Sequence, residues 1–298
     1  MGWIKPNFSK SAGPYAFSQI AQIREDLADE FEPRAARSLR NWPVRLSEKE
    51  FAGLPCLVVE PKNARPQRRF LHFFGGGYVS GCPEYDLPIL APLSCLCAAQ
   101  FIAPRYALAP EQAFPSAFQQ GDQLLRALIE ARGKTPLSVS GESAGAGLAT
   151  ALVQALPERQ RPAISQVLLM SPWCDLRDGA LRMADQTKDP TLTGQQLRVC
   201  ANIYAAEHDR ACNQLSPLAG QFGRHWPDTI LTTTTGDILY PMVRALQVKL
   251  QSAGAKVDCV TENWLWHVFE LYDELPQAET ALRKIAQLVL AKGQKKCS

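Results

Sequence analysis

The residues that could do chemistry begin with a serine between two glycines, in the stretch GESAG at 141–145. A strand-like run, LSVS, precedes this G-x-S-x-G motif, and a helix-like run, AGLATALVQAL, follows it. In that setting the motif forms a sharp turn that strains the serine backbone and exposes its hydroxyl. We therefore predict that Ser143 is a nucleophile. The alternative is an ordinary strand-to-helix turn in which the serine caps the helix.

A serine hydroxyl needs a base to become a nucleophile, and the chain has four histidines. His267 follows the strand-like run KVDCVTE, which is the place of the base in enzymes that order these groups as serine, acid, histidine. His72 lies inside an early strand and is interpreted as a core residue. His208 and His225 fall in an irregular segment where surface positions are expected. We predict that His267 is the base.

The acid that orients this histidine should follow the preceding strand. Asp237 stands directly after the run TILTTTT, behind a glycine turn. Asp175 and Asp178, near the end of SQVLLMSPW, are the alternatives, because some enzymes with this order of elements take the acid from an earlier strand. The sequence favours Asp237.

Three consecutive glycines, Gly75 to Gly77, follow the apolar run RFLHFF. Glycine is costly to order, so a triplet indicates that another group must approach the bare backbone. Attack of serine on a carbonyl creates an oxyanion, which N–H donors fixed in advance can stabilise. We predict these donors at Gly76, Gly77 and Ala144. A phosphate cradle is the rival interpretation, but the chain has neither a following Lys-Ser/Thr pair nor a G-x-G-x-x-G pattern here.

The elements that must position these groups alternate between strand-like and helix-like runs. Near-continuous apolar strands that alternate with helices indicate a mostly parallel α/β sheet covered on both faces, with ligands beyond the carboxyl ends of the strands. Strands are predicted at 56–60, 69–74, 100–106, 137–141, 165–171, 229–235 and 256–262. Helices are predicted at 117–131, 144–156, 242–253 and 277–292.

Two segments stand outside this alternation. The first fifty residues are predicted to be helical, with Pro33 interrupting or restarting the pattern. They carry an apolar stripe at three- and four-residue spacing, formed by Phe17, Ile20, Ile23, Leu27 and Phe31. Residues 184–225 are richer in polar residues and lack strand-like runs. The core is therefore expected to comprise 51–183 and 226–298.

Composition and charge exclude several classes of function. The net charge is +3 and the basic residues are scattered, so a nucleic-acid partner is not expected. No apolar stretch is long enough to span a membrane, and the N-terminus has no apolar core of signal-peptide length, so a cytoplasmic protein without a membrane partner is expected. The nine cysteines show no C-x-x-C pair and no zinc-like spacing, so buried free thiols and no metal are expected.

Taken in order, the motifs resemble the hormone-sensitive-lipase-like branch of the α/β-hydrolases, bacterial carboxylesterases with an HGGG loop and a G-D-S-A-G elbow. The matching stretches are FFGGGYVSG, RYALAPEQAFPSA, SGESAGAGLA, MSPWCDL, KDPTLT, GDILYP and HVFELY. The resemblance implies an α/β-hydrolase fold and a triad of Ser143, Asp237 and His267. It also implies a helical cap, built from 1–50 and 184–225, that roofs an apolar acyl pocket, and it implies no cofactor.

Five residues are expected near that pocket: Gly75, Tyr78, Glu142, Trp173 and Trp266. Core packing is an equal alternative for the three aromatic residues.

One position departs from the family, because Phe74 stands where the family has a histidine that hydrogen-bonds the loop backbone. His72 lies on the same strand face but about two residues of rise away, so it is not expected to substitute. The glycine loop is therefore expected to be looser or braced differently. A histidine restored at position 74 would then raise kcat.

The sequence as a whole predicts a serine carboxylesterase acting on short- to medium-chain, water-soluble esters. A deacetylase or amidase specific for one metabolite is the nearer alternative, and a ligand-binding relative without turnover is the more distant one. The predicted partner is a small-molecule ester, and a homodimer is left open.

Overall fold

Eight strands form one twisted sheet in the computed structural model, which describes residues 17–184 and 189–293. The strand order is β1-β2-β4-β3-β5-β6-β7-β8. The pairs β1–β2 and β2–β4 are antiparallel, and the other pairs are parallel. The strands are β1 (Val44–Phe51), β2 (Leu54–Pro61), β3 (Arg68–Phe73), β4 (Ala99–Pro104), β5 (Leu137–Glu142), β6 (Ile164–Met170), β7 (Thr229–Thr234) and β8 (Val257–Glu262).

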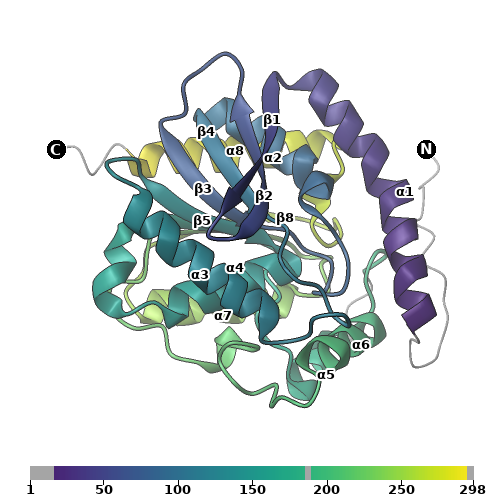
Figure 1. Cartoon of the computed structure of the whole chain (residues 1–298). Coiled ribbons are helices and arrows are strands. Elements are labelled where there is room, and N and C mark those ends of the chain that lie inside the picture. Colours follow the sequence, from purple (N-terminus) through teal and green to yellow (C-terminus); the bar gives the residue numbers. More distant parts are fainter. Residues whose placement is uncertain (1–16, 185–188, 294–298) are drawn as a thin grey trace.

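Helices cover both faces of this sheet, as Figure 1 shows. The helices are α1 (Phe17–Asn41), α2 (Leu87–Cys97), α3 (Ser116–Ala131), α4 (Ser143–Ala155), α5 (Asp178–Ala184), α6 (Gly194–Ala205), α7 (Tyr240–Ser252) and α8 (Pro276–Gly293). Helices α3, α4 and α7 lie on one face, and α2 and α8 lie on the other with α1 beside them. The predicted fold class, a mostly parallel α/β sheet flanked by helices, is confirmed.

The hydrophobic core is divided by the sheet into two clusters. Alternate residues of one strand point to opposite faces, so neighbours in β3 belong to different clusters. Leu71 packs with the residues of α3, α4 and α7, whereas Phe70 packs with those of α2 and α8. Because both faces are covered, central strands such as β5 and β7 are buried at every position.

All seven predicted strands are present, and the one strand that was not predicted lies near the N-terminus. Residues 44–50, predicted to be helical, belong to the edge strand β1, which pairs in antiparallel register with β2. Helix α1 does not break at Pro33, which lies inside it. The eighth strand, β1, escaped detection because half of its residues are exposed and it therefore lacks an apolar run.

The remaining helices lie at one end of the sheet. Figure 1 shows α1 running down one side of the molecule towards α5 and α6. The described part of 184–225 contains α6 and a short 3₁₀ helix and no strand. Residues 1–16 and 185–188 of the two predicted cap segments lie outside the described residues. The assignment of 1–50 and 184–225 to a cap stays a prediction.

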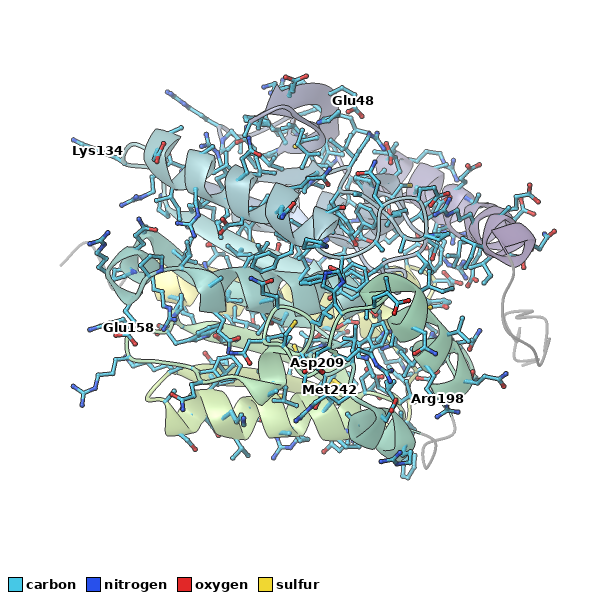
Figure 2. All side chains as sticks on the ribbon, turned by 60° about the horizontal axis from the view of Figure 1, so that its bottom comes forward. Glu48, Lys134, Glu158, Arg198, Asp209 and Met242 are labelled. Atoms are coloured by element: carbon cyan, nitrogen blue, oxygen red, sulfur yellow. The ribbon has the colours of Figure 1, made fainter. Side chains whose placement is uncertain are left out.

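The surface carries charges of both signs. Figure 2 shows the basic side chains of Lys134 and Arg198 at opposite ends of the view, with the acidic Glu48 and Glu158 elsewhere on the outline. Across residues 17–184 and 189–293, no helix has the length and apolar character needed to cross a membrane. The eight cysteines in that part of the chain are free; three are buried and five are half-buried.

Candidate active site

The nucleophile motif forms the junction between β5 and α4. Ser143 has a φ of 50°, a left-handed conformation that strains a residue with a side chain. A Cβ added at Gly145 would lie 2.1 Å from the carbonyl oxygen of Phe73, and one at Gly147 would lie 2.1 Å from that of Trp173. Both glycines are therefore needed because other segments of backbone lie against them. The sharp turn predicted from the motif is present.

Three predicted residues from distant parts of the chain meet at the carboxyl ends of the strands. The Oγ of Ser143 lies 2.8 Å from Nε2 of His267, and Nδ1 of His267 lies 3.0 Å from Oδ1 of Asp237. An ionised carboxylate can only accept, so Nδ1 donates to Asp237 and Nε2 is left to accept the hydroxyl proton of Ser143. The structure thus brings together the serine, the base and the acid that the sequence predicts.

The electrostatic setting of His267 favours its charged form. Burial would lower the pKa of this imidazole, but the adjacent Asp237 carboxylate, together with the charges of Asp189 and Glu142, outweighs burial and raises the pKa to about 9. The side chain of Asp237 is fully buried and that of His267 is 11% exposed. An imidazolium formed on His267 is therefore stabilised by its surroundings.

The alternative residues are occupied elsewhere. Asp175 hydrogen-bonds Arg177, and the exposed Asp178 pairs with Arg210, so neither carboxylate contacts His267. His208 and His225 are exposed, as expected for surface positions. His72 is fully buried, as predicted. Its two ring nitrogens lie 2.9 Å from Oγ of Ser140 and 2.7 Å from Oδ2 of Asp86.

The glycine triplet forms a loop beside Ser143. Gly76 and Gly77 have φ values of 100° and 65°, which only glycine adopts without strain. Among the described residues, no hydrogen bond uses the N–H group of Gly76 or Gly77. Ala144 lies in the first turn of α4, where backbone N–H groups have no partner within the helix. The three predicted donors are therefore available to an anionic oxygen.

Phe74 and Tyr106 brace the glycine loop in place of the family histidine. The ring of Phe74 stacks on that of Tyr106 with the centroids 4.2 Å apart. The hydroxyl of Tyr106 donates to the carbonyl oxygen of Phe74 at 2.7 Å. The loop is thus braced differently, and the side chain that holds its backbone comes from the segment after β4.

Glu142 contacts the same loop at Gly75. Its carboxyl group occupies the place where a side chain at Gly75 would be, because a Cβ there would lie 2.0 Å from Oε1. Burial, and next the charge of Asp86, raises the pKa of Glu142 to about 8, while a hydrogen bond from the Gly75 backbone acts in the opposite direction. Glu142 therefore tends to be neutral at pH 7 and fixes the loop through contact.

A cleft of about 190 Å³ opens above Ser143 and His267. Helix α1 contributes four residues of its apolar stripe to the lining, and α6 contributes Leu197 and Cys200. The guanidinium of Arg24 anchors α1 by donating to the carbonyl oxygens of Val79 and Ala109 at 2.9 and 3.1 Å. The α1 residues in the lining are Ile20, Ile23, Leu27 and Phe31.

The five residues predicted near the pocket divide into two groups. Gly75, Glu142 and Trp173 line the cleft. Tyr78 does not, because its ring is buried behind the loop and stacks on Tyr204 with centroids 3.9 Å apart. Trp266 is also absent from the lining, and its ring packs edge-on against Tyr272. For these two residues the structure shows packing behind the cleft rather than a place on its wall.

A family model described as the α/β-hydrolase fold matches residues 70–271, which include the glycine loop, the elbow, Asp237 and His267. The chain belongs to the α/β-hydrolase family.

Sequence relatives of this α/β-hydrolase include bacterial enzymes. An acetyl-hydrolase from Streptomyces hygroscopicus is 30% identical over 221 residues, covering 72% of this chain and 73% of the relative. An esterase from Acinetobacter venetianus is 28% identical over 254 residues, covering 83% and 82%. The crystal structure of an esterase from the bacterial hormone-sensitive lipase family matches with a TM-score of 0.79 at 22% identity, covering 95% of this chain and 99% of that one.

Two residues in contact with the site of this α/β-hydrolase were given no role by the sequence. Tyr106 lies in the stretch RYALAPEQAFPSA, which carries no evident catalytic group. Asp189 lies in KDPTLT, where an aspartate two residues before a threonine is typical of a side-chain-capped turn. Both act through backbone contacts with distant segments, which a local pattern does not predict. Within the described residues, no group of three metal-binding side chains is found.

Proposed function

We propose that this chain hydrolyses short- to medium-chain, water-soluble carboxylic esters through an acyl-enzyme on Ser143. The observation that carries this proposal is the 2.8 Å contact between Ser143 Oγ and His267 Nε2, beside the N–H groups of Gly76 and Gly77, which make no hydrogen bond with the described residues. A hydroxyl next to a base and an oxyanion site is the arrangement that acyl transfer requires.

Family membership and the named relatives support the broader enzyme class. The chain is a carboxylic ester hydrolase: curated relatives that cover most of its length are named esterase and acetyl-hydrolase. The residues that would perform the reaction, and the substrate range, form the proposal.

In the first half of the proposed reaction, Ser143 Oγ attacks the ester carbonyl as His267 Nε2 takes its proton. The carbonyl oxygen becomes an oxyanion and accepts hydrogen bonds from the N–H groups of Gly76, Gly77 and Ala144. The positive end of helix α4 lies at the same point and favours negative charge. His267 then gives its proton to the leaving alcohol, which leaves an acyl group on Ser143.

In the second half, water enters and loses a proton to the same Nε2 of His267 as it attacks the acyl carbon. Asp237 keeps the imidazole in the required tautomer in both halves and stabilises the cation that forms. Collapse of the second tetrahedral intermediate releases the carboxylic acid and returns the proton to Ser143. Each half uses the same oxyanion site.

The substrate class is inferred from the cleft. Its lining is mainly aliphatic and aromatic, and among the described residues it includes no Arg or Lys. Such a surface favours a neutral, apolar acyl chain over an anionic one. The cleft reaches from Ser143 to the apolar side chains of α1 and α6, which is farther than an acetyl group extends, so acyl chains of several carbons fit.

The test is covalent labelling with a fluorophosphonate, followed by turnover of a p-nitrophenyl ester series. We expect the parent protein to be labelled and Ser143→Ala to be neither labelled nor active, with kcat reduced by a factor on the order of 10⁶. The rate should peak at short to medium acyl chains. Labelling of Ser143→Ala would refute the nucleophile, and a peak at long chains would refute the substrate range.

One relative favours a second candidate function. The relative from Streptomyces hygroscopicus is named an acetyl-hydrolase, which points to removal of acetyl groups from a metabolite. That function predicts a steep preference for acetyl over butyryl esters, because a dedicated acetyl site rejects longer chains. Comparing kcat/KM for p-nitrophenyl acetate and butyrate separates the two candidates.

A further inference from the structure

Asp189 lies between the two loops that carry the acid and the base. It follows the polar segment after α5, and its side chain is buried, with 9% of its surface exposed. No cation pairs with this carboxylate among the described residues. Hydrogen bonds to both of its oxygens hold it instead, and these bonds reach three different segments of the chain.

One carboxylate oxygen is used locally. Oδ1 accepts hydrogen bonds from the backbone N–H of Thr191 at 2.8 Å and from the hydroxyl of Thr191 at 2.7 Å. This turn fixes the direction of the carboxylate and leaves Oδ2 free to face the triad.

The second oxygen bridges the catalytic loops. Oδ2 accepts from the backbone N–H of His267 at 2.9 Å and from that of Ile238 at 3.2 Å. Ile238 is the residue after Asp237, so one oxygen atom sets the spacing between the loop after β7 and the loop after β8. The two loops are also joined by the 3.0 Å contact between the Asp237 and His267 side chains and, nearer to the strands, by the bonds of Thr234 and Thr235 to residues 262, 264 and 265.

We propose that Asp189 is a positioning residue of this esterase: its Oδ2 holds the Asp237 and His267 loops in register, and its negative charge stabilises the imidazolium formed on His267. This inference rests on the proposed function, because it concerns the proton that His267 carries during that reaction. Asp189 does not line the cleft, so it acts without touching the substrate.

The charge of Asp189 acts among other groups that face His267. Asp237 faces it from the loop after β7, Glu142 from the end of β5, and Glu270 from the 3₁₀ helix Phe269–Leu271. Asp237, Asp189 and Glu142 all raise the pKa of His267. Burial raises the pKa of Glu270 itself to about 7. Neutralising Asp189 should lower the pKa of His267 while the other three groups remain.

The experiment compares the parent with Asp189→Asn, using kcat, KM and the pH dependence of kcat/KM. Asparagine keeps the shape of the aspartate side chain but removes its charge. Its NH₂ group would replace one accepting oxygen and would face N–H or O–H groups that also donate. We expect kcat to fall roughly 10- to 100-fold with KM within about twofold, because a small displacement of reacting groups is costly to the rate. The acid limb of kcat/KM should move to lower pH by roughly half a unit, since His267 loses a stabilising charge.

Asp175→Asn is the matched control. Asp175 is also buried and accepts hydrogen bonds in a local turn, yet its hydrogen bonds with the described residues come from Arg177 alone. The Asp175→Asn variant should leave the acid limb of kcat/KM unchanged. Asp189→Glu keeps the charge but displaces the carboxylate, so it should lower kcat while its acid limb stays near that of the parent. If Asp189→Asn fails to fold, the kcat of Asp189→Glu tests the inference instead.

Two results would overturn the inference. A folded Asp189→Asn variant with parental kcat would show that the bridge is not needed, and a lower kcat with an unmoved acid limb would show a merely structural role. A parental kcat in Asp189→Glu would likewise show that the bridge is not needed. Failure of the proposed function is distinguishable, because then the parent itself would show no turnover that depends on Ser143.

Discussion

The elbow at 141–147 and the glycine loop at 74–81 both bring bare backbone close to other atoms, but they are held in different ways. In the elbow, each glycine lies against backbone: Gly141 against Gly145, Gly145 against Phe73, and Gly147 against Trp173. In the loop, Gly76 and Gly81 lie against the loop's own backbone, but Gly75 and Gly77 lie against side chains from β5 and α6. The elbow is shaped by main-chain packing, whereas the loop depends in addition on side chains that distant elements supply.

The two regions meet at Gly145, whose substitution should have the largest effect. In Gly145→Ala the new Cβ would lie 2.1 Å from the Phe73 carbonyl oxygen and 2.2 Å from that of Phe74. Both carbonyls belong to backbone that cannot move without shifting the loop, so we expect kcat to fall at least about 10³-fold. Steady-state kinetics measure this. Gly179→Ala, where no atom lies within 4 Å of the new Cβ, should retain parental activity.

Removal of the remote brace should have a smaller effect. Tyr106→Phe keeps the stacked ring but deletes the hydroxyl that donates to the Phe74 carbonyl. We expect kcat to fall roughly tenfold, less than the 10²–10³ lost when an oxyanion donor is removed outright. The free energy of unfolding should fall by about 1 kcal/mol, measured by urea denaturation. In Tyr240→Phe, whose hydroxyl makes no hydrogen bond with the described residues, neither quantity should change.

A histidine placed at position 74, where the family has one, tests whether the glycine loop is already braced. Because Phe74 is buried and its carbonyl is already held by Tyr106, Phe74→His should not raise kcat, contrary to the expectation from the sequence. The buried imidazole should instead lower the free energy of unfolding by about 1–3 kcal/mol. A kcat above the parental value would mean that the loop lacks an effective brace.

The last effect, on the pH dependence of stability, concerns Glu142, which lies between the two regions. The pKa of this carboxyl is about 8 in the folded chain, above its ordinary value of 4.5, so the folded state holds a proton that the unfolded state loses. Stability is therefore lost as pH rises from about 4.5 to 8. In Glu142→Gln the loss of unfolding free energy between pH 5 and pH 8 should be smaller by on the order of 2 kcal/mol. The measurement is Tm, which should drop less over this pH range than in the parent.

Asp86 has a raised pKa as well, owing to burial, so some dependence on pH should remain in Glu142→Gln. The exposed Glu50→Gln variant on β1 provides the control and should lose Tm with pH as the parent does. An unaltered slope in Glu142→Gln would contradict the placement of a buried, proton-holding carboxyl beneath Gly75.

The sequence predicted the parts of this protein that local patterns encode. Seven strands were found because their sequences form apolar or β-branched runs, and β1 was missed because half of its residues are exposed. The elbow was recognisable because its glycines are required within five residues. Tyr78 and Trp266 were placed at the cleft although they pack behind it, because an aromatic residue near a motif does not reveal which way its ring points.

By itself, the sequence determined the alternation of seven strands with helices, the strained serine turn, and the three groups that follow strands β5, β7 and β8. It could do so because hydrophobic periodicity and glycine spacing act between near neighbours. The tertiary structure alone decided how those groups are held: Tyr106 beneath Phe74, Glu142 against Gly75, and Asp189 between two loops. These contacts join residues 32, 67 and 78 positions apart, and such distances close only when the sheet has formed.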